Sequence, residues 1–146
     1  MNNKSSNYDY LISELIDLLS IMQIKEIKFN NKRKIYSKQM KDISVDINKL
    51  IRNKKIDING EIIRKIAFVG ISNLLVWELK DLMLSNKKDY DKFLQKALEL
   101  NIIRNKVFNT MMIDFNEFDE TRKRNETLNK RKRKWCKSIM NSFDNQ

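Results

Sequence analysis

The chain has 146 residues, a formal net charge of +11 and a pI of about 9.7. Its length suits one domain with a hydrophobic core, and 41% hydrophobic and 34% charged residues are typical of a globular protein. The absence of histidine excludes Ser-His-Asp and Cys-His catalysis and histidine-ligated metals. Cys136 is the single cysteine, so it can form neither an internal disulfide nor a metal cluster. We expect no metal and no cofactor.

Two features predict the location of the protein. No apolar run reaches the roughly 18 to 20 residues that a transmembrane helix needs, and the polar N-terminus lacks the apolar core of a secretory signal. Together with the single thiol, they predict a cytoplasmic protein without membrane contact.

Few turn-forming residues, with no proline and only two glycines, predict long helices with short connections. Apolar residues recur at spacings of three and four, without convincing period-two alternation. They predict helices over residues 8–29, 37–53, 61–84, 89–112 and, with weaker amphipathicity, 117–143. We therefore expect an all-α, up-and-down bundle of four to five helices in a single domain, residues 8–143, after a disordered N-terminus, residues 1–7.

The third predicted helix is apolar nearly all round, which predicts a central helix covered on more than one side. Asp57 or Asn59 is available to cap its start. Trp77 within it belongs either to the core or to a dimer surface.

The positive charge is concentrated near the C-terminus. Residues 122–137 hold nine Lys or Arg against one Glu, which accounts for +8 of the net +11. Such asymmetry indicates contact with a polyanion, above all a nucleic acid. The alternative is a solvated, lysine-rich helix face in a chain of biased composition.

Three polar residues lie together late in the apolar fourth segment: Arg104, Asn105 and Asn109. Arg104 and Asn109 are five residues apart, so they should project near one another on successive turns. Arginine stays protonated and grips phosphate through a two-pronged donor set, whereas asparagine cannot transfer a proton. The group is therefore suited to holding phosphate or RNA, and poorly suited to cleaving it. The structural alternative is an Arg104 that pairs with a carboxylate such as Glu99 or Glu78.

This stretch resembles the signature of the HEPN superfamily, small all-α bundles found in ribonuclease toxins, abortive-infection proteins and CRISPR-linked effectors. The family motif is an Arg, a polar residue that is often Asn, three variable residues and a His. Arg104 and Asn105 match the first two positions, and Asn109 stands where the His belongs. The resemblance is loose over residues 61–140 and close only over residues 100–109.

In the family, two protomers bring their motifs together across a two-fold interface to form a metal-independent ribonuclease cleft. The resemblance thus implies a homodimer, with Arg104 as a phosphate clamp and Asn105 as an orienting residue. Asn109, at the third position of the catalytic set, cannot act as a general base. Residual activity would rest on positioning and electrostatics. A non-cleaving relative and a chain substituted at position 109 to silence a toxic nuclease both fit this pattern.

A basic run forms the second candidate site. Five cations precede an aromatic residue there, and they would contact phosphates without reading sequence. Trp135 either stacks on a base or anchors the helix. The predicted nucleic-acid-binding residues are Lys106, Arg122, Arg124, Lys130, Arg131, Lys132, Arg133, Lys134 and Trp135. A nuclear-localisation signal and a site for an acidic protein partner are the alternative roles of this run.

The first functional hypothesis is a HEPN-like RNA-binding protein, ribonuclease-related but lacking a general base. It would act in phage defence or in a toxin–antitoxin system, with an antitoxin or another protein as a possible partner. The alternative is a non-enzymatic basic helical subunit or adaptor of a nucleoprotein complex, in which Arg104 is structural.

Overall fold

The computed structural model describes residues 10–127 and 139–143, and these contain helices and loops but no strand. The expected all-α bundle is therefore confirmed. Its elements are α1 (Ile12–Lys28), the short 3-10 helix η1 (Asn30–Lys32), α2 (Arg33–Lys54), α3 (Gly60–Ser85), the short 3-10 helix η2 (Lys87–Asp89), α4 (Tyr90–Asp114) and a helical stretch at residues 139–143. The predicted disordered N-terminus, residues 1–7, lies outside the described residues.

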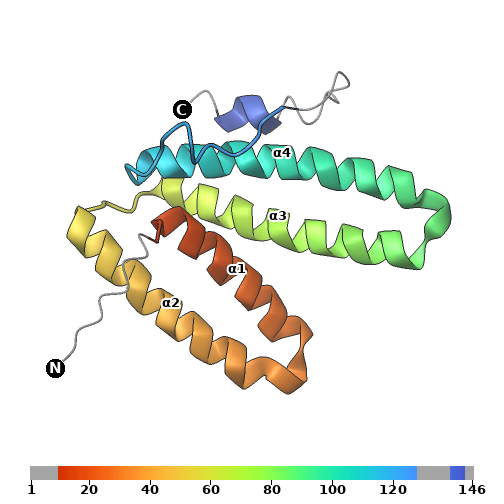
Figure 1. Ribbon diagram of the computed structural model, residues 1–146, viewed down its shortest axis with the longest axis horizontal. Coiled ribbons are helices and arrows are strands. Elements are labelled where there is room, and N and C mark those ends of the chain that lie inside the picture. The colour runs from red at the N-terminus through yellow and green to blue at the C-terminus, as the bar shows by residue number, and fades with distance from the viewer. Residues whose placement is uncertain (1–9, 128–138, 144–146) are drawn as a thin grey trace.

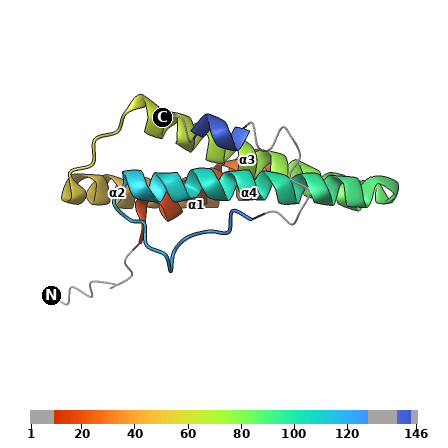
Figure 2. The same ribbon diagram turned by 90° about the horizontal axis from the view of Figure 1, so that it is seen from above.

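The helices form two antiparallel hairpins, α1–α2 and α3–α4 (Figure 1). Across the molecule the order is α4, α3, α1 and α2, because α3 packs on both α4 and α1, and α2 packs on α1. Seen from above, the assembly is flattened, and residues 139–143 lie beside the first turns of α3 (Figure 2). The far end of the α3–α4 hairpin extends beyond α1 and α2.

The main core lies where α1, α3 and α4 meet. Ile12 and Val69 are fully buried there, and so are Val107, Met111 and Phe115 at the end of α4. Each such side chain contributes about 1.5–3 kcal/mol when it is removed from water. Phe143 closes this core from the C-terminal stretch and packs edge-on against Phe68, with ring centroids 5.1 Å apart. The motif segment of α4, residues 104–109, is therefore held on a well-packed base.

Most helix ends predicted from the sequence lie within a few residues of the ends in the structure. Asn59 caps α3, because its side-chain oxygen accepts a hydrogen bond from the Ile62 amide at 3.0 Å. Asn59 is one of the two residues, with Asp57, that the sequence predicted as candidates for this cap. None of the helices in the described ranges is long and apolar enough to cross a membrane.

The predicted last helix, residues 117–143, is wrong in its first part, because residues 115–127 are not helical. Glu117 is 2% exposed, and its carboxylate accepts hydrogen bonds from the Ile12 and Ser13 amides at 2.5 and 3.0 Å. It thus satisfies the free amides at the start of α1 from a distant part of the chain. Asp119 then forms a local turn with Thr121. These bonds replace the helical ones that this segment would otherwise make.

The prediction that α3 is a central helix covered on more than one side is confirmed, because α3 packs on both α4 and α1. A further row of large apolar side chains on α3 is nevertheless exposed to solvent within the described structure. The exposed members are Ile63, Ile71, Leu74, Leu75 and Leu82. Trp77 is half-buried and lies edge-on to Phe29, with centroids 6.0 Å apart. The helices that the structure describes therefore do not cover α3 completely.

Candidate functional site around Arg104

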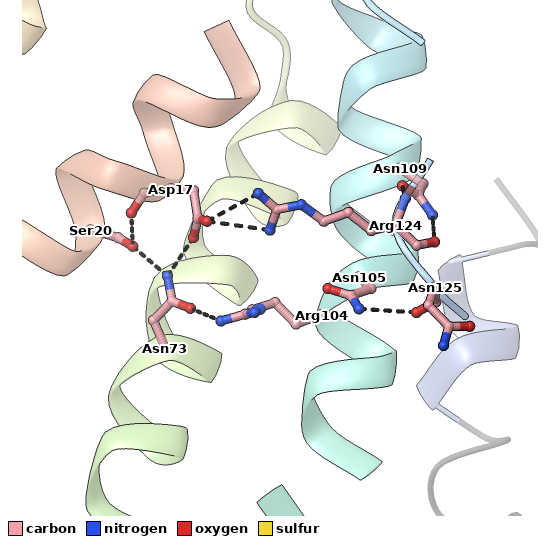
Figure 3. A network of polar contacts seen from close by, with 8 residues as sticks. All are labelled: Asp17, Ser20, Asn73, Arg104, Asn105, Asn109, Arg124 and Asn125. Carbon is pink, nitrogen blue, oxygen red and sulfur yellow. Dashed lines mark hydrogen bonds and ion pairs between the residues drawn. The ribbon is translucent and has the colours of Figure 1, made fainter. Parts of the chain in front are cut away.

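Arg104 points from α4 towards α3 rather than along α4 (Figure 3). Its Nη1 donates a hydrogen bond to Oδ1 of Asn73 at 2.5 Å. Its Nε is buried and has no hydrogen-bond partner among the described residues. The guanidinium therefore belongs to an internal polar cluster between three helices.

Asn73 is the centre of that cluster. While its oxygen accepts from Arg104, its amide nitrogen donates to Oδ1 of Asp17 at 2.7 Å and to Oγ of Ser20 at 2.6 Å. Ser20 in turn donates to the carbonyl oxygen of Asp17 at 2.8 Å. Asn73 is 6% exposed, so a side chain with both donors and an acceptor is needed to link α1 to α4 across α3.

Asp17 also binds the segment that follows α4. Its Oδ2 accepts from Nη1 and Nη2 of Arg124 at 3.3 and 3.4 Å. The same guanidinium lies over the ring of Phe108, with its Cζ 3.4 Å from the ring centroid. Such stacking is favourable because the face of the ring is electronegative. Arg124 is therefore held both by an ion pair with α1 and by an aromatic contact with α4.

Asn109 faces the backbone of the same segment. Its Oδ1 accepts from the Arg124 amide at 2.9 Å, and its Nδ2 donates to the Arg124 carbonyl at 2.8 Å and to Oε1 of Glu126 at 3.0 Å. The side chain is 3% exposed. Both of its N–H groups and its oxygen are thus engaged in holding residues 124–126 against α4.

Asn105 is the third member of the predicted motif. It is half-buried, and its Nδ2 donates to the carbonyl oxygen of Asn125 at 3.0 Å. Asn105 and Asn109 thus hold neighbouring residues of one segment, whereas Arg104 turns towards α3 (Figure 3). The structure links Arg104 and Asn109 through Arg124, Asp17 and Asn73, and not by a direct hydrogen bond among the described contacts.

The electrostatics of the cluster are unbalanced. Arg104 and Arg124 face one carboxylate, that of Asp17. Burial lowers the pKa of Arg104 from its ordinary value; the negative charge of Asp17 opposes this shift, and the positive charge of Arg124 adds to it. Arginine nevertheless remains charged at any accessible pH, because its ordinary pKa lies far above neutrality. The site is a cationic cluster in which two carboxylates, those of Asp17 and Glu126, accept hydrogen bonds from its amide and guanidinium groups.

This arrangement positions a chain segment and offers little chemistry. Carboxamides and guanidinium groups cannot take a proton from a ribose hydroxyl near neutral pH. The carboxylates of the cluster could, but Asp17 accepts from Asn73 and Arg124, and Glu126 accepts from Asn109. Among the described residues, no group of three His, Cys, Asp or Glu side chains is placed to hold a metal ion. What the contacts accomplish is the attachment of residues 124–126 to α1 and α4.

The other predicted nucleic-acid-binding residues fall into two groups. Lys106 is half-buried, Arg124 is engaged as described, and Arg122 is exposed, with its Nη1 donating to the Glu117 carbonyl at 2.9 Å and its Nε 3.5 Å from Asp119. The basic run Lys130–Trp135 lies outside the described residues.

Sequence reasoning missed Asp17 and Asn73, which complete the cluster. Asn73 is a carboxamide in the middle of the most apolar helix, and Asp17 interrupts an apolar stripe of α1. A polar residue at a core position needs a partner, which is the signal that could have identified both.

No protein family, curated protein or solved structure matches this chain significantly.

Proposed function

We propose that this chain is a non-enzymatic helical module that binds RNA or another nucleic acid through the phosphate backbone. The observation that supports it most is the engagement of the motif residues: Asn109 is fully hydrogen-bonded, and Arg104 donates to Asn73 in the interior. Residues placed in this way serve the structure. The net charge of +11 then provides the attraction between the protein and the nucleic acid, because cations attract phosphates without a shaped active site.

The cluster fixes the position of the segment that precedes the basic run in the sequence. Residues 124 and 125 are hydrogen-bonded to Asn109 and Asn105 on α4, five residues before Lys130. The basic run therefore follows, within five residues along the chain, a segment that is held against α4. Several cations close together in the sequence attract one polyanion jointly.

The ribonuclease-like alternative requires a different arrangement of the same residues. It needs Arg104 in an open cleft shared by two protomers, and a proton acceptor free to reach the RNA, whereas the carboxylate beside position 109, that of Glu126, accepts a hydrogen bond from Asn109. The HEPN assignment and a role in phage defence or in a toxin–antitoxin system stay predictions. A homodimer is supported by the exposed apolar row of α3 defined above, since an apolar face is a common basis of self-association.

The experiment is a salt titration of RNA binding, measured by fluorescence anisotropy with a labelled 20-nucleotide single strand. The arm variant replaces Lys130, Arg131, Lys132, Arg133 and Lys134 with Gln. If all five cations contact phosphates, the slope of log K against log salt should fall by about 3.5, at roughly 0.7 per contact.

The matched control removes the same charge from the far end of the α3–α4 hairpin and from the nearby face of α4. It replaces five exposed lysines with Gln: Lys80, Lys87, Lys88, Lys92 and Lys96. We expect this control to keep most of the slope. Equal losses in both variants would assign binding to net charge alone, and an absence of binding by the unmodified chain would refute the proposed function.

A further inference from the structure

A second basic surface lies on α2, away from the C-terminal run. Residues 32–55 hold nine Lys or Arg against two Asp, a local balance of +7. The net charge of +11 does not reveal this local excess, because acidic residues elsewhere in the chain offset it. α2 forms the edge of the molecule opposite α4 (Figure 1).

The helical spacing gathers these cations into one row. Lys34, Lys38, Lys41 and Arg52 lie at intervals of four, three and eleven residues, which are close to whole numbers of helical turns. All four are exposed. At 1.5 Å per residue the row is about 27 Å long. We call these four residues the α2 cation row.

Of the two acidic residues of α2, Asp42 lies nearer to this row. It is rotated by about 100° from Lys41 but by only about 40° from Lys38, one turn before it. Asp46 is one turn further along on the same side as Asp42, and it pairs with Lys49 at 3.8 Å, which is not part of the row. One carboxylate of α2, that of Asp42, thus flanks the row beside Lys38, against four cations in the row.

The first half of the row lines an open depression of about 420 Å³. Lys34, Lys38 and Lys41 border it with Arg33 and Ser37, and Glu26 of α1 adds one carboxylate. Four cations against one anion leave the depression strongly positive. A row of separate positive charges, with hydroxyl and amide side chains between them, matches the regular phosphates of a nucleic-acid strand.

We infer that the α2 cation row is a second binding surface for a sugar-phosphate backbone, an inference that rests on the proposed function. The apolar side of α2, with Ile47, Leu50 and Ile51, packs towards the core and is not available for insertion into a lipid surface. Val45 is the one large apolar side chain along the row itself, so a nucleic acid fits this surface better than a membrane.

The test uses the full chain with Lys34, Lys38, Lys41 and Arg52 all replaced by Gln. Gln has nearly the helix propensity of Lys and Arg, and the four side chains are exposed, so α2 should keep its structure. The matched control replaces Lys80, Lys88, Lys92 and Lys96 with Gln, which removes the same charge. Circular dichroism should show equal helix content in both.

Binding to a 20-nucleotide single strand is measured between 50 and 200 mM salt, with RNA and DNA in parallel. Loss of four phosphate contacts should lower the log–log slope by about 3, so that the fourfold rise in salt weakens binding about 50-fold less than it weakens the unmodified chain. Amide chemical shifts along α2 should move when the strand is added. Equal loss for RNA and DNA would identify the shared phosphate backbone as the ligand.

The outcomes separate this inference from the proposed function. If the arm variant loses binding and the α2 variant behaves like its control, the inference fails and the proposed function stands. If the α2 variant alone loses binding, the inference stands and the arm assignment fails. If the unmodified chain binds phosphatidylserine vesicles but neither RNA nor DNA, both are overturned.

Discussion

The side chain of Asn109 forms a reciprocal pair with the backbone of Arg124. Asn109 accepts from the Arg124 amide at 2.9 Å and donates to the Arg124 carbonyl at 2.8 Å, much as two residues pair between strands. Asn109 is also the residue that stands where the resembling motif has its His. The side chain in the His position of the motif thus fastens residues 124–126 to α4.

The first prediction concerns the structural role of Asn109. Asn109→Ala leaves buried polar groups of residues 124 and 126 without their partner, so we expect a loss of about 2–3 kcal/mol in the free energy of unfolding. Urea denaturation followed by circular dichroism measures it. Asn48→Ala, at an exposed position of α2, is the matched control and should change stability by less than about 0.5 kcal/mol. Equal effects of the two changes would show that the reciprocal pair is dispensable.

A second prediction concerns Glu117 as a distant cap of α1. Its carboxylate accepts from the Ile12 and Ser13 amides, from the Ser13 hydroxyl at 2.8 Å, and from Lys54 Nζ at 3.1 Å. Glu117→Ala removes all these bonds from a buried place, and we expect about 2–4 kcal/mol of destabilisation. Hydrogen exchange should quicken first at the start of α1. Glu120→Ala, at an exposed position, should leave both measurements unchanged.

The third prediction tests the ion pair between Asp17 and Arg124. Asp17→Asn leaves two guanidinium groups facing no charge, so we expect about 2 kcal/mol of destabilisation for this partly exposed pair. A double-mutant cycle with Arg124→Gln should give a coupling energy of about 1 kcal/mol, measured by urea denaturation. Strict additivity of the two changes would contradict a direct interaction.

A fourth prediction follows from the turn at Asp119. The hydrogen bond from the Thr121 hydroxyl, followed by backbone hydrogen bonds and the charge of Arg122, holds the pKa of Asp119 below its ordinary value, against a small effect of desolvation. A lowered pKa in the folded state means that the turn is stabilised at pH above about 3.9, and that this stabilisation is lost as the pH falls through the lowered pKa. NMR titration of the Asp119 carboxyl should show the shift, and Thr121→Val should raise the pKa towards its ordinary value. An unchanged titration in Thr121→Val would disprove this cause.

The fold could be predicted from the sequence because its determinants are local. The spacing of Ile12 and Ile16, and of Val107 and Met111, places each pair on one helix face before any neighbour is known. The exposed side of α3 could not be foreseen in this way, because coverage depends on how many helices the chain supplies. The apolar pattern of α3 is the same whether its second side meets a helix or water.

The site could be predicted only in part. Arg104, Asn105 and Asn109 were identified as a polar group in an apolar helix, and the structure does engage all three. Their partners were not foreseeable: Asn73 lies 31 residues from Arg104, and Ile12 lies 105 residues from Glu117. The same long-range bonds explain why residues 117–127 are not helical despite their composition.

The central claim is that this chain holds nucleic acid without cleaving it. The most direct test incubates an end-labelled 20-nucleotide RNA with the chain in EDTA, and follows both binding and strand integrity on native and denaturing gels. The account predicts a complex that dissociates steeply with salt and an RNA that stays intact, also with Asn109→His. Metal-independent cleavage by the unmodified chain or by Asn109→His would contradict it.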